Sequence, residues 1–145
     1  MPARRRHCRR FIVSRNRIHD NDNIGIDFIG FEGTGPDGQD QARHGVCTDN
    51  VIHNISSAAN PTYGGGLSAG GIYVDGGRDI VIERNKVDRC DIGIEVASEH
   101  RGKAAGNITV RNNFVSRSHQ SSIMIGGSGE DNGGAAGIAV VHNTL

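Results

Sequence analysis

Residues 80–96 read IVIERNKVDRCDIGIEV, and this stretch contains the pattern that decides the fold. An apolar triplet at 80–82 is followed three residues later by Asn85 and five residues later by Val87. The stretch ends on Ile94-Glu95-Val96, whose strict alternation is the period of a β-strand. We interpret the stretch as two short strands separated by a bend that the Asn marks. Such a coil cannot bury its apolar side alone, so it must stack on others like it.

The same pattern recurs in phase along the chain. Apolar triplets occupy 11–13, 45–47, 80–82, 108–110 and 138–140, and an Asn follows each after three residues: Asn16, Asn50, Asn85, Asn113 and Asn143. An apolar residue follows each triplet after five residues: Ile18, Ile52, Val87, Val115 and Leu145. A second strand recurs at 26–28, 72–74, 94–96 and 123–125, and insertions at 30–44, 56–70, 98–106 and 126–136 vary the spacing. Variable loops between regular strands indicate a repeat architecture.

The Asn column has a structural explanation. Asn tolerates left-handed backbone conformations and bonds to nearby backbone groups. Stacked Asn side chains can also bond to one another along the stack, so that amides at the bends are not buried without partners. We therefore predict a structural role, and no catalytic one, for these five residues.

Composition places the chain in the all-β class. Aromatic residues make up 4% of the sequence, Trp is absent, and there are 22 Gly. Gly disfavours helix interiors by about 1 kcal/mol each, so a helical bundle is not expected. Cys47 occupies a position where other repeats carry an inward Val or Ile, which predicts a small core residue.

Charge is distributed unevenly although the formal net charge is zero. Five Arg lie within residues 1–10, which we predict to be a disordered basic leader. The remaining chain has an excess of acidic residues, which argues against a nucleic-acid partner. Residues 1–10 contain no apolar secretory segment, and no stretch reaches the length of a membrane span.

The repeated Asn-x-apolar and Gly-Ile-x-Val elements resemble those of the right-handed parallel β-helix proteins, the superfamily of pectate lyases, polygalacturonases, alginate lyases and mannuronan epimerases. The resemblance covers residues 11–145 and implies about five coils with long loop insertions. It also implies an extracellular or cell-surface protein. Leu145 falls in the middle of a coil and no cap is visible, so we expect a domain truncated at its C-terminal end. Open coil ends would then favour self-association.

The outward positions of the second strand are the candidate site. They are Asp27, Tyr73, Glu95 and Met124, with Asp75 two residues after Tyr73. Parallel strands lie about 4.8 Å apart, so the three carboxylates are expected within one or two strand spacings. The neighbouring loops add further candidates: Glu32, Glu99, His100, Arg101 and Lys103.

Clustered carboxylates allow two kinds of chemistry. Like charges raise one pKa and leave a proton donor beside an ionised partner, as glycoside hydrolysis requires, with Asp27, Asp75 and Glu95 as candidates. Alternatively, the same three residues bind Ca²⁺, which can bridge protein carboxylates and an acidic sugar.

A lyase would need a base and a cation, for which Lys103 and the pair of His100 with Glu99 are candidates. Tyr73, Glu99, Arg101 and Glu32 are the predicted substrate-binding residues.

The sharper signatures of the resembled enzymes are missing. The chain has no Asp-Asp pair, no Gly-His-Gly and no Tyr-Gly-Phe-Asp-Pro-His. Two functions therefore stay open: a carbohydrate-active protein that binds and cleaves a polysaccharide as a lyase or glycosidase, and a non-catalytic surface, adhesion or structural scaffold. The outward residues of the first strand favour the scaffold, since apolar patches mark interaction surfaces: Ile12, Val46 and Val81.

Overall fold

The computed structural model describes residues 10–33, 35, 40–127, 129 and 131–145. Of the predicted basic leader only Arg10 is described, and residues 1–9 lie outside these ranges. Parts of two predicted insertions, residues 34, 36–39, 128 and 130, also lie outside them. The described chain is all-β apart from two short 3-10 helices, η1 (Ser57–Ala59) and η2 (Pro61–Tyr63).

The strands form three parallel sheets. The first sheet contains β1 (Ile12–Ser14), β4 (Arg43–Thr48), β7 (Arg78–Glu83), β10 (Ala104–Arg111) and β13 (Gly134–Val141) in that order. The second contains β2 (Arg17–Asn21), β5 (Val51–Ile55), β8 (Lys86–Cys90) and β11 (Phe114–Ser116). The third contains β3 (Ile26–Asp27), β6 (Gly70–Asp75), β9 (Ile92–Ala97) and β12 (Ser121–Ile125). Successive strands of each sheet come from successive repeats, which is compatible with the predicted parallel β-helix.

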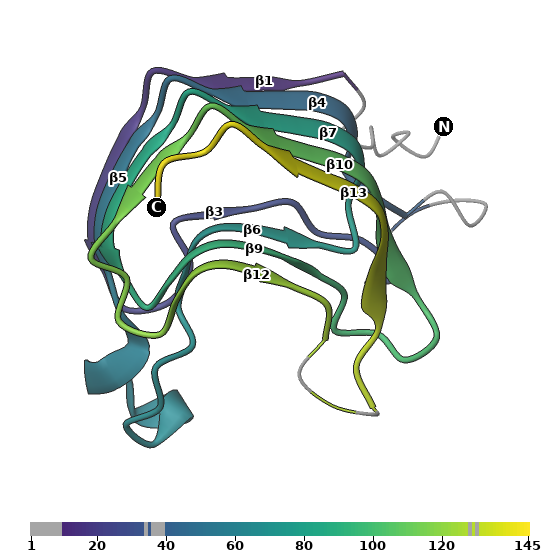
Figure 1. The fold of residues 1–145 in the computed structure, drawn as a ribbon. Coiled ribbons are helices and arrows are strands. Elements are labelled where there is room, and N and C mark those ends of the chain that lie inside the picture. Colours follow the sequence, from purple (N-terminus) through teal and green to yellow (C-terminus); the bar gives the residue numbers. More distant parts are fainter. Residues whose placement is uncertain (1–9, 34, 36–39, 128, 130) are drawn as a thin grey trace, which may run out of the picture.

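Figure 1 shows the three sheets as three sides around a common interior, with the first sheet facing the third. The sequence analysis was wrong in assigning two strands to each repeat. The Asn-x-apolar element does not form a simple bend, because its apolar residue lies within a strand of the second sheet. The predicted phase is confirmed, since Ile12 pairs with Val46 and Val46 with Val81.

The interior is filled by the apolar columns that the alternation predicted. Isoleucine and valine side chains dominate it, and Cys47 is fully buried among them, as predicted. Fully buried members come from all three sheets: Ile52, Ile72, Ile82, Val87, Ile94 and Val110. Burying such a side chain contributes about 1.5–3 kcal/mol, so the stacked columns are the main stabilising element.

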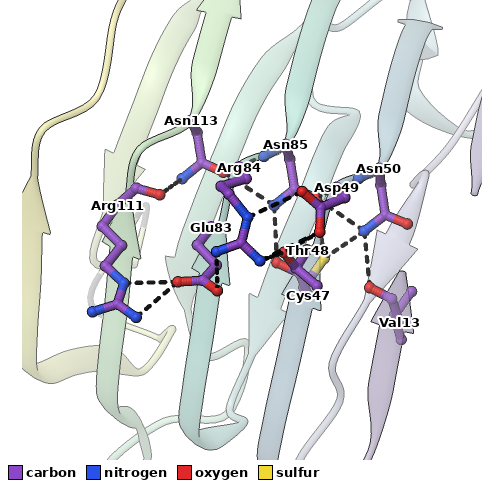
Figure 2. A network of polar contacts seen from close by, with 10 residues as sticks. All are labelled: Val13, Cys47, Thr48, Asp49, Asn50, Glu83, Arg84, Asn85, Arg111 and Asn113. Carbon is purple, nitrogen blue, oxygen red and sulfur yellow. Dashed lines mark hydrogen bonds and ion pairs between the residues drawn. The ribbon is translucent and has the colours of Figure 1, made fainter. Parts of the chain in front are cut away.

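The Asn column forms a continuous hydrogen-bonded ladder, which confirms the predicted structural role. Each Asn Nδ2 donates to the Oδ1 of the next Asn at 2.9–3.0 Å, from Asn16 through Asn143. The same Oδ1 atoms accept from the backbone N–H of the preceding Asn at 3.0 Å. Figure 2 shows the central part of the ladder, from Asn50 to Asn113. The ladder therefore satisfies the buried amides at this corner.

Left-handed residues lie at every corner, and one part of the Asn explanation needs correction. The residue with positive φ is the one before each Asn: Arg15, Asp49, Arg84, Asn112 and His142. The corner between the second and third sheets has a similar column: Asp20, Asn54, Arg89 and Arg117. The ladder Asn side chains therefore act through their hydrogen bonds and not through their own backbone conformation.

Close backbone approach explains the Gly that precedes most strands of the third sheet. A Cβ on Gly93 would lie 2.5 Å from the carbonyl oxygen of Ser122 and 2.4 Å from Val115, and one on Gly71 would lie 2.8 Å from the carbonyl oxygen of Gly93. Ser122 belongs to β12, which is the edge strand of the third sheet within this chain. A side chain fits there because no further strand within the described ranges lies beyond β12.

Candidate functional site

The predicted column on the outer face of the third sheet is present. Asp27 pairs in register with Tyr73, Tyr73 with Glu95, and Glu95 with Met124. The residues next to Asp27, Tyr73 and Glu95 are buried in the core, so these three side chains point outward, and the register places Met124 in the same row. The strands thus place one carboxyl group on each side of Tyr73, with Asp27 on one neighbouring strand and Glu95 on the other.

Two loops enclose this face and leave a hollow between them. One wall comes from the 56–69 segment, which contains η1 and η2 and contributes Tyr63 and Ser68. The other comes from the segments after β9 and β12, including Ser98 and Glu99. Figure 1 shows both segments projecting from the side of the third sheet. The hollow has a volume of about 310 Å³, which is large enough for a sugar ring.

Glu95 is the acidic residue best placed in this hollow. It lines the hollow together with Tyr73 and Glu99. Burial raises the pKa of Glu95 to about 7, and the charges of Glu99 and Asp75 add to the effect. At neutral pH this carboxyl group is therefore partly protonated, so it can act as a proton donor.

Asp27 has a raised pKa, as Glu95 does, but it lies outside the lining of the hollow. Burial raises the pKa of Asp27 to about 7, with contributions from the charges of Asp75 and Glu99. Its Oδ1 atom is buried and has no hydrogen-bond partner among the described residues. Asp27 is not among the residues that line the hollow, although it belongs to the same column as Glu95.

Asp75 is buried beneath the loop that carries Glu99. Asp75 is 5% exposed, and its Oδ1 accepts a hydrogen bond from the Glu99 backbone N–H at 2.8 Å. Burial raises the pKa of Asp75, while the Glu99 N–H opposes that rise. This geometry favours a role in which Asp75 positions Glu99.

Tyr73 is more buried than a sugar-stacking platform would be. It is 6% exposed, and burial raises the pKa of its hydroxyl well above the ordinary range. The aromatic residue on the wall of the hollow is Tyr63, whose hydroxyl donates to Asn23 Oδ1 at 2.7 Å. Sequence analysis missed Tyr63 because the path of an insertion cannot be read from the repeat pattern.

The remaining predicted residues lie outside the lining of the hollow. Glu32 and His100 form a pair at 2.9 Å. Lys103 Nζ lies 5.4 Å from the centre of the Phe31 ring, and Arg101 pairs with Asp131 at 3.5 Å. Among the described residues, no Lys, Arg or His lines the hollow.

The three carboxylates predicted to bind Ca²⁺ do not converge on one point. Within the described ranges, no group of three His, Cys, Asp or Glu side chains is arranged to hold a metal ion. Asp27, Asp75 and Glu95 therefore do not form a ready coordination site as they are placed.

Asp91 is a further residue that sequence analysis missed. It is fully buried, and its Oδ2 accepts from the Ser57 N–H at 2.8 Å and the Ala69 N–H at 3.2 Å. Its Oδ1 lies 2.9 Å from His119 Nδ1. Burial alone would raise the pKa of Asp91, but its hydrogen bonds, led by those from His119 and Ser57 and joined by those from Ser56 and Ala69, together hold the pKa below its usual value. Asp91 thus fastens both ends of the 56–69 wall to the sheet.

Comparison with known proteins gives one curated relative. The chain is 45% identical over 135 residues, or 93% of its length, to a protein of Bacillus subtilis (strain 168) described as uncharacterized protein YwoF. The matched part spans 29% of the length of that relative. No protein-family model matches the chain, and no solved structure matches it. Within the described ranges, no helix has the length and apolar character needed to cross a membrane.

Proposed function

We propose that this protein is a carbohydrate-active protein of the right-handed parallel β-helix type, which binds an extracellular polysaccharide in the hollow over the third sheet and cleaves it. The observation that carries the proposal is Glu95. This carboxyl group has a pKa of about 7, lines a hollow of about 310 Å³ and has Glu99 close by. A protonated acid next to a second carboxylate is the arrangement that glycoside hydrolysis needs.

Glu95 is the proposed general acid. Its proton would pass to the glycosidic oxygen as the bond from that oxygen to the anomeric carbon breaks. Water would attack the anomeric carbon and lose its proton to a second carboxylate. Glu99 is a better candidate for this base than Asp27, because Glu99 lines the hollow and Asp27 does not. Asp75 also holds the Glu99 backbone in place by accepting its N–H.

Hydrolysis is favoured over elimination because no cationic side chain is among the described residues that line the hollow. A lyase stabilises the developing charge on a uronate carboxylate with a positive group. Neither basic candidate lines the hollow, because Lys103 lies over the Phe31 ring and Arg101 pairs with Asp131.

The test is turnover of a panel of neutral and acidic polysaccharides by the wild type and two variants. Glu95→Gln should abolish the release of reducing ends, and wild-type turnover should fall above about pH 7 as the proton donor ionises. Asp49→Asn is the matched control, because it makes the same change at an exposed residue on a distant corner. Both variants need the far-UV circular dichroism of the wild type.

The outcomes separate the possible reactions. Reducing ends without unsaturated products support a hydrolase. Absorbance from unsaturated uronides that no longer forms when EDTA is added would instead indicate a calcium-dependent lyase. Undiminished turnover in Glu95→Gln would exclude the proposed acid.

A scaffold is the second candidate function, and the outer face of the first sheet favours it. One outward row lies in register along this face, and its first residue is 73% exposed. The row consists of Ile12, Val46, Val81, Thr109 and Ala139. Such a row of small and apolar side chains suits contact with another protein. Binding of the panel polysaccharides without turnover of any, or no binding at all, would favour this function.

A further inference from the structure

The outer face of the second sheet has a chemistry opposite to that of the hollow. Two neighbouring rows run across its strands in register. One row is Arg17, Val51, Lys86 and Phe114, and the other is His19, His53, Asp88 and Ser116. Two cationic residues, Arg17 on β2 and Lys86 on β8, therefore share one row on a side of the molecule that the proposed function does not use.

A second hollow lies between these rows. Its volume is about 290 Å³, and its lining consists of Arg17, Val51, His53, Lys86, Asp88 and Arg89. Val51 occupies the strand between the two cations in the first row. Because Val51 is short and apolar, it leaves space between the longer Arg17 and Lys86 side chains. Those two residues are two strand spacings apart, or about 9.6 Å between their Cα atoms.

The neighbouring carboxylate, Asp88, pairs with other cations and not with Arg17 or Lys86. One of those other cations is Arg89 in the same lining, whose Nη1 lies 3.4 Å from Asp88 Oδ2. Asp88 accepts from Arg117 at 2.7 and 2.6 Å and from the Ser116 hydroxyl at 2.9 Å. Within the described ranges, neither Arg17 nor Lys86 makes a side-chain hydrogen bond or ion pair. Two cations thus face a shared space with no anionic partner of their own.

His53 gives an independent sign that a partner is missing. Both of its ring nitrogens are buried, and neither has a hydrogen-bond partner among the described residues. Its ring stacks on that of His19 with 4.9 Å between centroids and 2° between planes. Buried polar atoms are normally satisfied, and exceptions call for an explanation such as a bound water or ion. A small shift of the ring would let one nitrogen donate to a group held in the hollow.

We propose that Arg17, Lys86 and His53 form a binding site for a tetrahedral oxyanion, that is, a phosphate or sulfate group. The arginine fork offers parallel N–H donors to such a group, the lysine adds a mobile point charge, and the histidine adds a third donor. The group binds above Val51, either as a free ion or carried by a polymer. The site is independent of the hollow over the third sheet, so each can fail without the other.

The test is a titration of the ¹⁵N-labelled full chain with sodium sulfate and sodium phosphate at constant ionic strength, followed by amide chemical shifts. The shifts should concentrate at residues 51–53. Arg17→Gln and Lys86→Gln should each weaken binding about tenfold, since each removes one charge-assisted interaction. The double variant should abolish saturable binding, and His53→Gln should weaken it without removing it. These side chains are exposed or half-buried on an outer face, so the fold should survive.

Arg78→Gln is the matched control, because it removes one positive charge from the first sheet, where Arg78 pairs with Asp79. Dextran sulfate, compared with uncharged dextran, distinguishes a polymer-borne group from a free ion. Five of the first ten residues are Arg, so binding of dextran sulfate by the wild type alone decides nothing, and only the difference between variants counts.

Loss of inorganic-anion binding in the double variant supports a site for the free ion. Loss of dextran sulfate binding alone supports a polymer-borne group. The proposal is overturned if neither probe binds, or if the double variant binds both as tightly as Arg78→Gln does.

Discussion

Replacing Asn85 with Ala should destabilise the protein by about 3–5 kcal/mol, because this side chain is the centre of the ladder (Figure 2). Asn85 is 2% exposed. Its Oδ1 accepts from the Asn50 backbone N–H at 3.0 Å and from Asn50 Nδ2 at 2.9 Å. Its Nδ2 donates to the Cys47 carbonyl and to Asn113 Oδ1, both at 3.0 Å.

The magnitude follows from which partners lose their hydrogen bonds. In the variant the buried Asn50 N–H has no acceptor, which costs about 1–3 kcal/mol. The Cys47 carbonyl loses one bond, while Asn50 Nδ2 keeps its bond to Val13 and Asn113 Oδ1 keeps the Asn85 N–H. Each of these losses costs about 1 kcal/mol or less, because part of the bonding remains.

The assay is urea unfolding followed by far-UV circular dichroism, with a free-energy difference taken from the midpoint shift at unchanged slope. Asn16→Ala is the matched control at the exposed end of the ladder, because Asn16 only donates within the ladder and no buried N–H loses its acceptor. We expect it to cost about 1 kcal/mol or less. Asn85→Asp adds a sign test: the buried carboxyl should have a raised pKa, so its penalty should grow as the pH rises.

A stability of Asn85→Ala within about 1 kcal/mol of the wild type would contradict this prediction, and so would equal losses in Asn85→Ala and Asn16→Ala. Either result would mean that the apolar columns alone hold the repeats in register. A penalty for Asn85→Asp that shrinks with rising pH would also contradict the buried position of the ladder.

Three further predictions concern the site and its walls. Glu95→Gln should become more stable relative to the wild type as the pH rises from about 4.5 to 7: the raised pKa means that the wild-type contribution is complete at low pH and is lost over this range. Partial exposure limits the gain at pH 8 to about 1–2 kcal/mol in thermal or urea unfolding. Asp91→Asn should loosen the 56–69 wall, seen as faster amide hydrogen exchange at Ser57 and Ala69, whereas unchanged exchange would show that the wall holds without it. Gly93→Ala should cost about 2–3 kcal/mol or more because its Cβ would overlap backbone, and a urea midpoint equal to that of the wild type would disprove this close approach.

The phase of the fold could be predicted from sequence because two independent signals agree. Alternation marks which residues point inward, and the Asn column fixes the start of each repeat. The pairing of Asp27 with Tyr73 and of Tyr73 with Glu95 followed directly from that alignment. The repeat alignment alone is therefore enough to place the column of candidate residues on one face of one sheet.

The second sheet could not be predicted in this way. Its strand in the third repeat, β8, has five residues and includes the left-handed Arg89, and Arg84 is left-handed just before it, so the regular part is too short for alternation to show. Lys86 and Asp88 point outward and read as turn residues in the sequence. The left-handed residues themselves carry mixed, largely exposed side chains, so their identity gives no signal at these corners.

The sorting of the candidate site residues also depended on information outside the pattern. Glu95 lines the hollow while Asp75 is buried, although both point outward from the sheet. The difference arises from the 56–69 wall and from the loop after β9. Insertions follow paths set by specific contacts, such as those of Asp91, and not by the repeat.

The sheets differ in whether a cation pairs with an outward carboxyl group, and this difference supports a functional role for Glu95 on the third sheet. On the first sheet, Arg111 donates to Glu83 at 2.8 Å and lowers the pKa of that carboxyl. On the second sheet, Arg117 does the same for Asp88. Both acids are thereby stabilised in the ionised form. Glu95 has no such cation among the described residues, and burial beside other acids raises its pKa to about 7, which costs stability at neutral pH. Folding alone would favour an apolar or paired residue at that position, so a carboxyl group kept partly protonated inside a hollow is better explained by chemistry that uses its proton.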